Sequence, residues 1–216
     1  MSLTLHYHPL SSYSWKVLIP LYENATPFEP ALLNLADPAE RAAHLARWPM
    51  GKMPVLEDGA RGEIVAEASV IIDYLDRYYP GAVRFTPADP DQAWRTRFWD
   101  RFFDLHVQNH VQKLVGDRIR PAGQQDAYGV ADVRGQLAAA LAYLDSEAAK
   151  RTWFSGDSFG LADCAAAPAL YYADRVQPLG AGQGAVRAYL DRLMARPSFA
   201  RTLTEAEPYF AMFPTG

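Results

Sequence analysis

The stretch Met53-Pro54-Val55-Leu56-Glu57-Asp58-Gly59, followed by Glu63-Ile64-Val65, decides the fold of this chain of 216 residues. Two short apolar runs on either side of a glycine-containing turn predict a β-hairpin, a pair of antiparallel strands joined by a short connection. The hairpin leads into residues 67–79, where apolar side chains recur at helical spacing on one face: Val70, Ile71, Tyr74, Leu75 and Tyr78. The stretch therefore predicts a β-β-α unit.

The residues before this unit predict alternating strands and helices. A strand is predicted at 3–7, a helix at 13–24, a second strand at 28–35 and a helix at 38–47. Pro20 lies inside the first helix, where we expect it to remove one backbone hydrogen bond and to bend the helix. Pro30 favours an edge position for the second strand. The order β-α-β-α-β-β-α predicts an α/β fold with a parallel pair followed by an antiparallel hairpin.

The residues after the unit change character. Residues 79–90 contain three prolines and one glycine with little periodicity, which is typical of a linker. Beyond the linker no strand pattern is found. Helices are predicted at about 91–119, 130–150, 161–175, 183–195 and 198–206. The sequence therefore predicts an all-α second half.

Composition and charge exclude several classes of function. The formal net charge is -4 and no basic cluster is present, so we expect no nucleic-acid partner. No apolar run approaches the roughly 20 residues that span a bilayer, and the first residues lack a signal-peptide pattern, so we expect no membrane partner. The single cysteine, Cys164, cannot form an intramolecular disulfide or a CxxC pair. We therefore expect a cytoplasmic protein in which Cys164 is a small buried side chain.

Four segments, in this order, resemble the cytosolic glutathione S-transferase family. They are Ser11-Ser12-Tyr13-Ser14-Trp15-Lys16-Val17, Pro49-Met50-Gly51-Lys52-Met53-Pro54-Val55-Leu56, Glu67-Ala68-Ser69-Val70-Ile71-Ile72-Asp73-Tyr74-Leu75, and Gly156-Asp157 with Gly160-Leu161-Ala162-Asp163. The first segment is most similar to the zeta class, except that Tyr13 stands where that class has cysteine. Arg196-Pro197-Ser198-Phe199 also fits the family.

The resemblance implies a fold and a reaction. It implies a thioredoxin-like, glutathione-binding α/β domain at residues 1–80 and an all-helical domain at 91–216. The implied function is addition of the glutathione thiolate to small hydrophobic electrophiles, with glutathione as co-substrate and no tightly bound cofactor. A homodimer is also implied. Two alternatives stay open: a zeta-like glutathione-dependent isomerase, and a fold relative that binds ligands or a protein without turnover.

The resemblance also implies which residues activate the thiol. A free thiol has a pKa near 8.5, so a hydrogen-bond donor near a helix N-terminus is needed to favour the thiolate. Ser11 is the first candidate, followed by Ser12 and Tyr13, and Tyr7 stands where other classes place a catalytic tyrosine. Serines before a helix are also common simply as caps.

Further residues are implied to bind the tripeptide. A cis bond between Met53 and Pro54 would turn the Met53 backbone towards the cysteinyl part of glutathione, and Lys52 could contact the glycyl carboxylate. Glu67 could bind the γ-glutamyl ammonium group. Ala68 occupies the place of the family's serine, and Ser69 lies one position further along. We expect weaker glutathione binding for this reason.

Two features of the second half complete the expectations. Gly160 replaces the usual cap residue of the helix at 161–175, where Asp163 can still reach back to the first N–H groups. The apolar and histidine side chains between Trp94 and His110 are expected to form the wall on the electrophile side. His106 and His110 have metal-ligand spacing, but no third ligand is evident, so no metal site is predicted.

Overall fold

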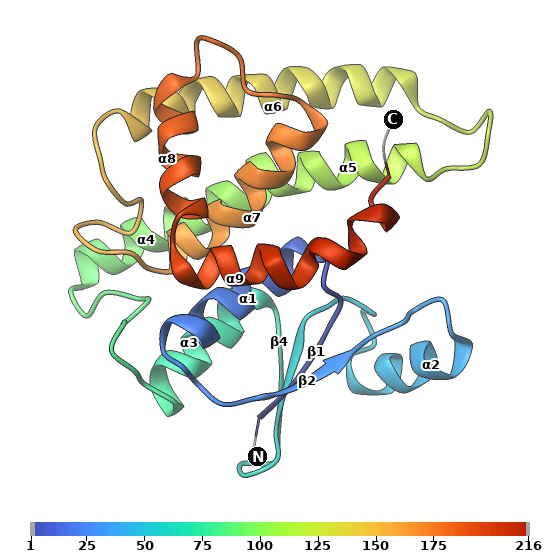
Figure 1. Ribbon diagram of the computed structural model, residues 1–216, viewed down its shortest axis with the longest axis vertical. Helices are drawn as coiled ribbons and strands as arrows, with labels where there is room; N and C mark the ends of the chain where they lie inside the picture. Colours follow the sequence, from blue (N-terminus) through green and yellow to red (C-terminus); the bar gives the residue numbers. More distant parts are fainter. Residues whose placement is uncertain (1–2, 215–216) are drawn as a thin grey trace.

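A four-stranded mixed sheet forms the first part of the chain, and the computed structural model describes residues 3–214 (Figure 1). The strand order is β2-β1-β3-β4, with bounds Leu3–Tyr7 (β1), Glu29–Leu32 (β2), Val55–Asp58 (β3) and Glu63–Ala66 (β4). β1 pairs in parallel with β2 and antiparallel with β3, and β3 and β4 form the antiparallel hairpin. Pro30 lies in the edge strand, as expected, because a proline cannot donate to a neighbouring strand.

Three helices accompany the sheet: α1 (Ser12–Glu23), α2 (Pro38–Arg47) and α3 (Ala68–Tyr78). α1 and α3 lie between the sheet and the helical half, whereas α2 extends to the side (Figure 1). α1 continues through Pro20 for three more residues, to Glu23. The buried face of α3 contains Ile71, Ile72 and Leu75, which packs the helix onto the core.

Asp58 ties the hairpin to α3. Its carboxylate accepts hydrogen bonds from the hydroxyls of Tyr74 (2.8 Å) and Tyr79 (2.5 Å) and from the Ala60 N–H (3.0 Å). Burial by itself raises the pKa of Asp58, but these hydrogen bonds outweigh it and the pKa lies below its ordinary value. The end of β3 is therefore held in place by an ionised side chain.

The second half is helical throughout the described residues. Its elements are α4 (Pro90–Phe102), a π-helical turn (Phe103–Gln108), α5 (Asn109–Arg118), α6 (Ala127–Ala148), α7 (Leu161–Val176), α8 (Gly184–Met194), α9 (Pro197–Ala206) and a 3₁₀ helix (Glu207–Met212). The π-helical turn divides the single helix that was predicted at 91–119. The helical periodicity of the sequence did not reveal this turn, which inserts a longer hydrogen-bond repeat.

The start of α7 is capped by a serine from the preceding connection rather than by the N-cap residue itself. The Ala162 N–H donates to Oγ of Ser155 (3.0 Å), and the Gly160 N–H donates to the Asp163 carboxylate (3.0 Å), so Asp163 reaches back as expected. A Cβ atom on Gly160 would lie 2.6 Å from the Phe85 carbonyl oxygen. Glycine is therefore required here for close packing, and Ser155 supplies the hydroxyl that Gly160 lacks.

The two halves share one core across α1, α7 and α9. Trp15 is fully buried and stacks on Tyr172 at 4.7 Å, and the Tyr172 hydroxyl donates to the Leu10 carbonyl (2.8 Å). Glu23 at the end of α1 forms an ion pair with Arg196 (2.7 Å). Cys164 is fully buried in α7, as expected, and burial raises the pKa of its thiol well above the ordinary value.

Candidate functional site

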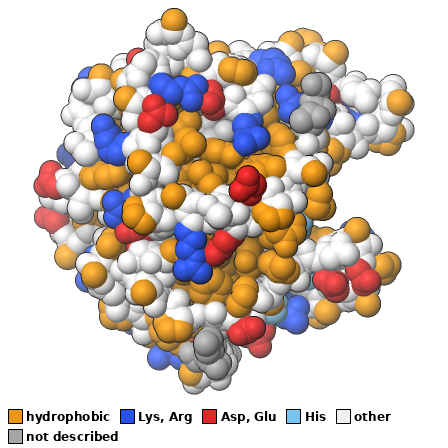
Figure 2. Space-filling model, in the orientation of Figure 1, with side chains coloured by type: hydrophobic (Ala, Val, Ile, Leu, Met, Phe, Trp, Pro, Cys, Tyr) orange, Lys and Arg blue, Asp and Glu red, His pale blue; other side chains and the backbone are white. Residues whose placement is uncertain are grey.

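A cleft of about 480 Å³ lies between the sheet half and the helical half. The space-filling view shows the molecule notched between the arm that carries α2 and the arm that carries α5 (Figure 2). Nine lining residues come from the first half and five from the second. They are Ser11, Tyr13, Trp48, Gly51, Lys52, Met53, Pro54, Glu67 and Ala68, with Arg101, Asp104, Leu105, Asn109 and Gln112.

Ser11 is the N-cap of α1. Its Oγ accepts a hydrogen bond from the Ser14 N–H at 3.3 Å, which fixes the hydroxyl at the positive end of the helix dipole. A serine hydroxyl that accepts at a cap still has its own hydrogen to donate. Ser12 is buried and does not line the cleft.

Tyr13 bridges the cleft. Its hydroxyl donates to Oδ1 of Asn109 on α5, at 3.3 Å. Burial, followed by the neighbouring Asp104 carboxylate, raises the pKa of Tyr13 above its ordinary value. The phenol is therefore neutral at physiological pH and acts as a hydrogen-bond donor.

The loop before β3 presents main-chain groups to the cleft. The Met53–Pro54 bond is cis, as predicted from the sequence. The preceding turn uses Gly51 in the left-handed region (φ 62°), which glycine adopts at no steric cost. Nε2 of buried His44 on α2 lies 2.9 Å from the Lys52 carbonyl oxygen; because a carbonyl can only accept, His44 is the donor. α2 therefore holds this loop in position.

Glu67 and Ala68 stand where β4 ends and α3 begins. Glu67 has a φ of 70°, an uncommon conformation for a residue with a side chain, and such outliers cluster at functional sites. The helix start at Ala68 gives the cleft a second set of N–H groups with a favourable dipole for an anion. Ala68 contributes no hydroxyl to this set.

Ser69 points away from the cleft, into a buried ionic network. Its Oγ donates to Asp100 (2.8 Å) and accepts from Nζ of Lys16 (2.9 Å), and Lys16 also contacts Asp104 (2.8 Å). Lys16 is 1% exposed and Asp100 3%. Burial raises the pKa of Asp104, an effect that Lys16 opposes. This network joins α1, α3 and α4, and it explains why Ser69 does not take the place of the missing hydroxyl at Ala68.

The helical half contributes Arg101, Asn109 and Gln112, which the sequence analysis missed. Together with Leu105 they recur at intervals of three and four, the signal of one helix face, and they straddle the π-helical turn. The expectation for the aromatic run was largely wrong. Trp94, Phe98 and Trp99 line a different cavity, Phe103 lies in the core, and only Leu105 of the expected wall reaches the cleft.

Tyr7 also lies elsewhere. It lines a separate cavity with Tyr22 and Glu205, and burial raises the pKa of its phenol. Within residues 3–214 no group of three or more His, Cys, Asp or Glu side chains is placed to hold a metal ion. None of the helices in this described part of the chain has the length and hydropathy needed to cross a membrane.

The fold and the cleft define a class of protein: a thioredoxin-like domain joined to an all-helical domain, with the site between them. Residues 5–83 match the family model for the glutathione S-transferase N-terminal domain, and residues 127–201 match that for the C-terminal domain. The chain belongs to the glutathione S-transferase family, and the fold that was expected from the sequence is confirmed.

Individual relatives agree with this assignment. The chain is 30% identical to glutathione S-transferase 3 of Zea mays, over 93% of each chain. It is 29% identical to glutathione S-transferase GstB of Escherichia coli, over 87% of this chain and 91% of the relative. A crystal structure of a glutathione S-transferase from Methylobacillus flagellatus with GSH bound superimposes with a TM-score of 0.83 at 31% identity, covering 93% of this chain and 98% of that one.

Proposed function

We propose that this chain is a glutathione transferase that adds the glutathione thiolate to small hydrophobic electrophiles. One observation supports this most directly. Ser11, the N-cap residue of α1, lines the same cleft as the Met53–Pro54 loop and the start of α3. One cleft thus contains a hydroxyl that can donate a hydrogen bond to a thiolate, main-chain groups that can pair with a peptide, and helix N–H groups that can bind a carboxylate.

In the proposed reaction Ser11 stabilises the thiolate. Its oxygen is engaged by the Ser14 N–H, so its hydrogen is available for the sulfur anion. A hydrogen bond to the charged form and the dipole of α1 both lower the pKa of a bound thiol. Tyr13 is a second neutral hydroxyl in the cleft, but its hydrogen is donated to Asn109, so it would have to leave that partner to serve the thiolate. Ser12, being buried outside the lining, is the weakest of the three candidates.

Charges along the cleft complement glutathione. Glu67 would pair with the γ-glutamyl ammonium group, and the N–H groups at the start of α3 with the adjacent carboxylate. Lys52 would pair with the glycyl carboxylate, and Met53 would contribute its main chain. Trp48, Tyr13 and Leu105 supply the apolar surface for an electrophile. Because this surface is small, the proposal is limited to small electrophiles.

Thermal unfolding with and without glutathione tests the proposal. A ligand at about 100 times its Kd stabilises the folded state by about 2.7 kcal/mol, which raises the melting temperature measurably. Glutamate and glycine together, at the same concentration, serve as the control. An unchanged melting temperature in millimolar glutathione would contradict every glutathione-dependent function. A positive result is followed by a conjugation assay with a chloro-aromatic acceptor.

Two further functions remain candidates. Ala68 and the engagement of Ser69 with Asp100 and Lys16 reduce the polar groups available for the tripeptide, which favours a binding protein without turnover. The Ser11-Ser12 motif favours a zeta-like isomerase, although Tyr13 replaces the cysteine of that class. Binding without conjugation identifies the first, and isomerisation of a cis double bond in the presence of glutathione identifies the second.

We also infer a homodimer in the cytosol, the compartment that glutathione keeps reduced. Ile64 on β4 and Val70 on α3 are 50% and 53% exposed, so both apolar side chains are available to an interface. Val70→Glu is expected to give a monomer in light scattering after gel filtration, with Lys113→Glu, an exposed position on α5, as the control. A monomeric wild-type chain would contradict this inference.

A further inference from the structure

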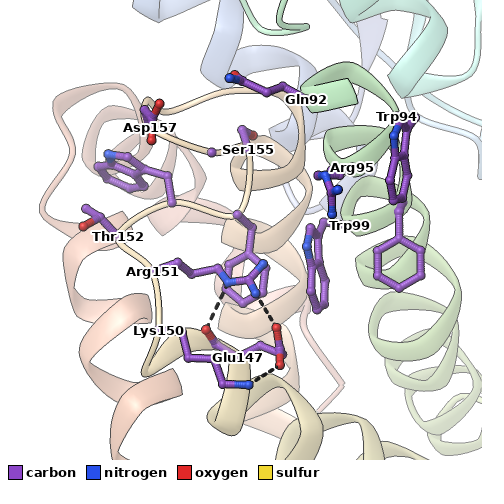
Figure 3. Close-up of a pocket in the computed structure, with 14 residues that line it drawn as sticks. Gln92, Trp94, Arg95, Trp99, Glu147, Lys150, Arg151, Thr152, Ser155 and Asp157 are labelled. Carbon is purple, nitrogen blue, oxygen red and sulfur yellow. Dashed lines mark hydrogen bonds and ion pairs between the residues drawn. The ribbon is translucent and has the colours of Figure 1, made fainter. Parts of the chain in front are cut away.

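Arg101 on α4 is the cation that the described part of the helical half contributes to the cleft. α4 carries three arginines, and their side chains lie in different surroundings. Arg95 projects into a separate cavity, where its guanidinium lies 4.5 Å from the Trp94 ring centroid (Figure 3). Arg97 is exposed and lines neither that cavity nor the cleft. Arg101 lines the same cleft as Ser11, and its side chain is 56% exposed.

The guanidinium of Arg101 uses only one of its nitrogens within the protein. Nη1 donates to the Asp104 carboxylate at 3.3 Å. Asp104 also accepts from Nζ of Lys16 at both of its oxygens, at 2.9 and 2.8 Å, so Lys16 is its nearer cation. A guanidinium has several N–H donors, arranged in a fork that matches a carboxylate. Arg101 can therefore keep its contact with Asp104 and receive a second carboxylate at its other nitrogens.

The part of α4 that carries Arg101 lies against the start of α3. Oγ of Ser69 donates to the Asp100 carboxylate at 2.8 Å, which brings the residue before Arg101 to the first turn of α3. Burial raises the pKa of Tyr13, and charges that include Arg101 and Glu67 modify it. Arg101 and Glu67 therefore lie near one phenol, at the end of the cleft where α3 begins.

The charges that line the cleft match those of glutathione when Arg101 is included. Glutathione carries two carboxylates and one ammonium group. The two cations among the described lining residues are Lys52 and Arg101. Of the two lining carboxylates, Asp104 is paired with Lys16, whereas Glu67 forms no ion pair within residues 3–214. The γ-glutamyl carboxylate and ammonium group are attached to the same carbon, so their partners must be neighbours, as Arg101 and Glu67 are.

We propose that Arg101 holds the γ-glutamyl carboxylate of glutathione, together with the N–H groups at the start of α3. The inference rests on the proposed glutathione-dependent function and adds to it a binding residue from the helical half. Ala68 has no hydroxyl to offer this carboxylate, and the hydroxyl of Ser69 donates to Asp100 instead. The guanidinium supplies a charge-assisted hydrogen bond in place of that hydroxyl. Glutathione bound in this way contacts both halves of the molecule.

Two analogues, each lacking one carboxylate charge, test which group Arg101 holds. 4-Aminobutanoyl-cysteinylglycine lacks the γ-glutamyl carboxylate and keeps the ammonium group, and the glycyl ethyl ester of glutathione lacks the glycyl charge. Titration calorimetry measures the Kd of each analogue and of glutathione. Arg101→Gln is expected to weaken binding of glutathione and of the ester about tenfold, as for loss of a charge-assisted hydrogen bond. The same substitution should leave the affinity for the aminobutanoyl analogue unchanged.

Lys113→Gln, at an exposed lysine on α5, changes the net charge equally and should leave all three affinities unchanged. Equal weakening of all three ligands by Arg101→Gln would show a general disturbance of the cleft through Asp104. Weakening of the aminobutanoyl analogue but not of the ester would assign Arg101 to the glycyl carboxylate. Either result, or an unchanged affinity for glutathione, would overturn the inference and leave the proposed function standing. A wild-type chain that does not bind glutathione would overturn both.

Discussion

Nζ of Lys16 lies 2.7 Å from Oδ1 of Asp100, and these two almost fully buried side chains connect the sheet half to the helical half. Asp104 and Ser69 complete the network. Lys16 belongs to α1 and both aspartates to the start of the helical half, so this lysine pairs with two carboxylates across the boundary, and Arg101 pairs with Asp104 as well, at 3.3 Å. The network lies directly behind the cleft, because Asp104 also lines it.

Lys16→Met is expected to destabilise the fold by about 3–5 kcal/mol, because it leaves the buried Asp100 carboxylate without its cation and Asp104 with Arg101 alone. Urea unfolding at pH 7 measures the effect, and Lys113→Met, an exposed lysine, is the control. Burial already raises the pKa of Asp104, and losing Lys16 raises it further, so the deficit should shrink as the pH falls and Asp104 becomes protonated. A deficit below about 1 kcal/mol would show that the network contributes little.

Ser155→Ala is expected to destabilise the protein by about 1 kcal/mol, since it removes the hydroxyl that accepts from the Ala162 N–H. Ser158→Ala, at an exposed serine three residues further along the same connection, is the control. Adding Gly160→Ser to Ser155→Ala should not restore stability, because the new Cβ would lie 2.6 Å from the Phe85 oxygen. Rescue by the second substitution would disprove the packing argument. Chemical denaturation of the three variants decides between them.

Asp58→Asn tests the tie between the hairpin and α3. The folded-state pKa of Asp58 is lowered, so its contribution is present above the unfolded pKa of about 3.9 and is lost as the pH falls through the folded value. We expect a loss of about 2 kcal/mol at pH 7 that diminishes below about pH 4. Asp191→Asn, an exposed change of the same kind, is the control. A pH-independent difference would contradict the role of the ionised carboxylate.

Ser11→Ala is expected to lower the conjugation rate at pH 7 by at least about tenfold, because a thiol with a pKa near 8.5 is only a few per cent ionised at that pH. The deficit should narrow above about pH 9, where the thiolate forms unaided. Absorbance of the bound thiolate near neutral pH gives an independent reading. Ser12→Ala, at the neighbouring buried position, should retain the wild-type profile; an equal loss in both would point to a defect in α1 instead.

Ala68→Ser is expected to tighten glutathione binding about tenfold, if the family's hydroxyl is what this cleft lacks. Titration calorimetry measures the affinity, with Ala139→Ser on the exposed face of α6 as the control. The hydroxyl of Ser69 is held by Asp100 and Lys16, so Ser69→Ala should alter stability more than affinity. If Ser69→Ala weakened glutathione binding and left stability unchanged, Ser69 would be a glutathione-binding residue.

The sequence by itself determined the order of strands and helices, the helical second half and the family. Period-2 and period-3.6 patterns are local, and prolines and glycines mark the breaks. It also placed Ser11, Met53 and Glu67 together through the resemblance. Local patterns could not reveal the π-helical turn at 103–108, which changes the hydrogen-bond repeat without changing the apolar spacing enough to be noticed.

Only the tertiary structure decided which side chains share a space. In the folded chain the Ser69 hydroxyl contacts Lys16 and Asp100, and Tyr13 donates to Asn109. Ser155 supplies the hydroxyl that Gly160 lacks, and the aromatic side chains of α4 line a cavity separate from the cleft. Apart from the nearby cap at Ser155, these relationships join residues that are far apart in the chain. A side chain's partner across such a distance depends on how the helices pack, and packing is a property of the whole fold rather than of any one segment.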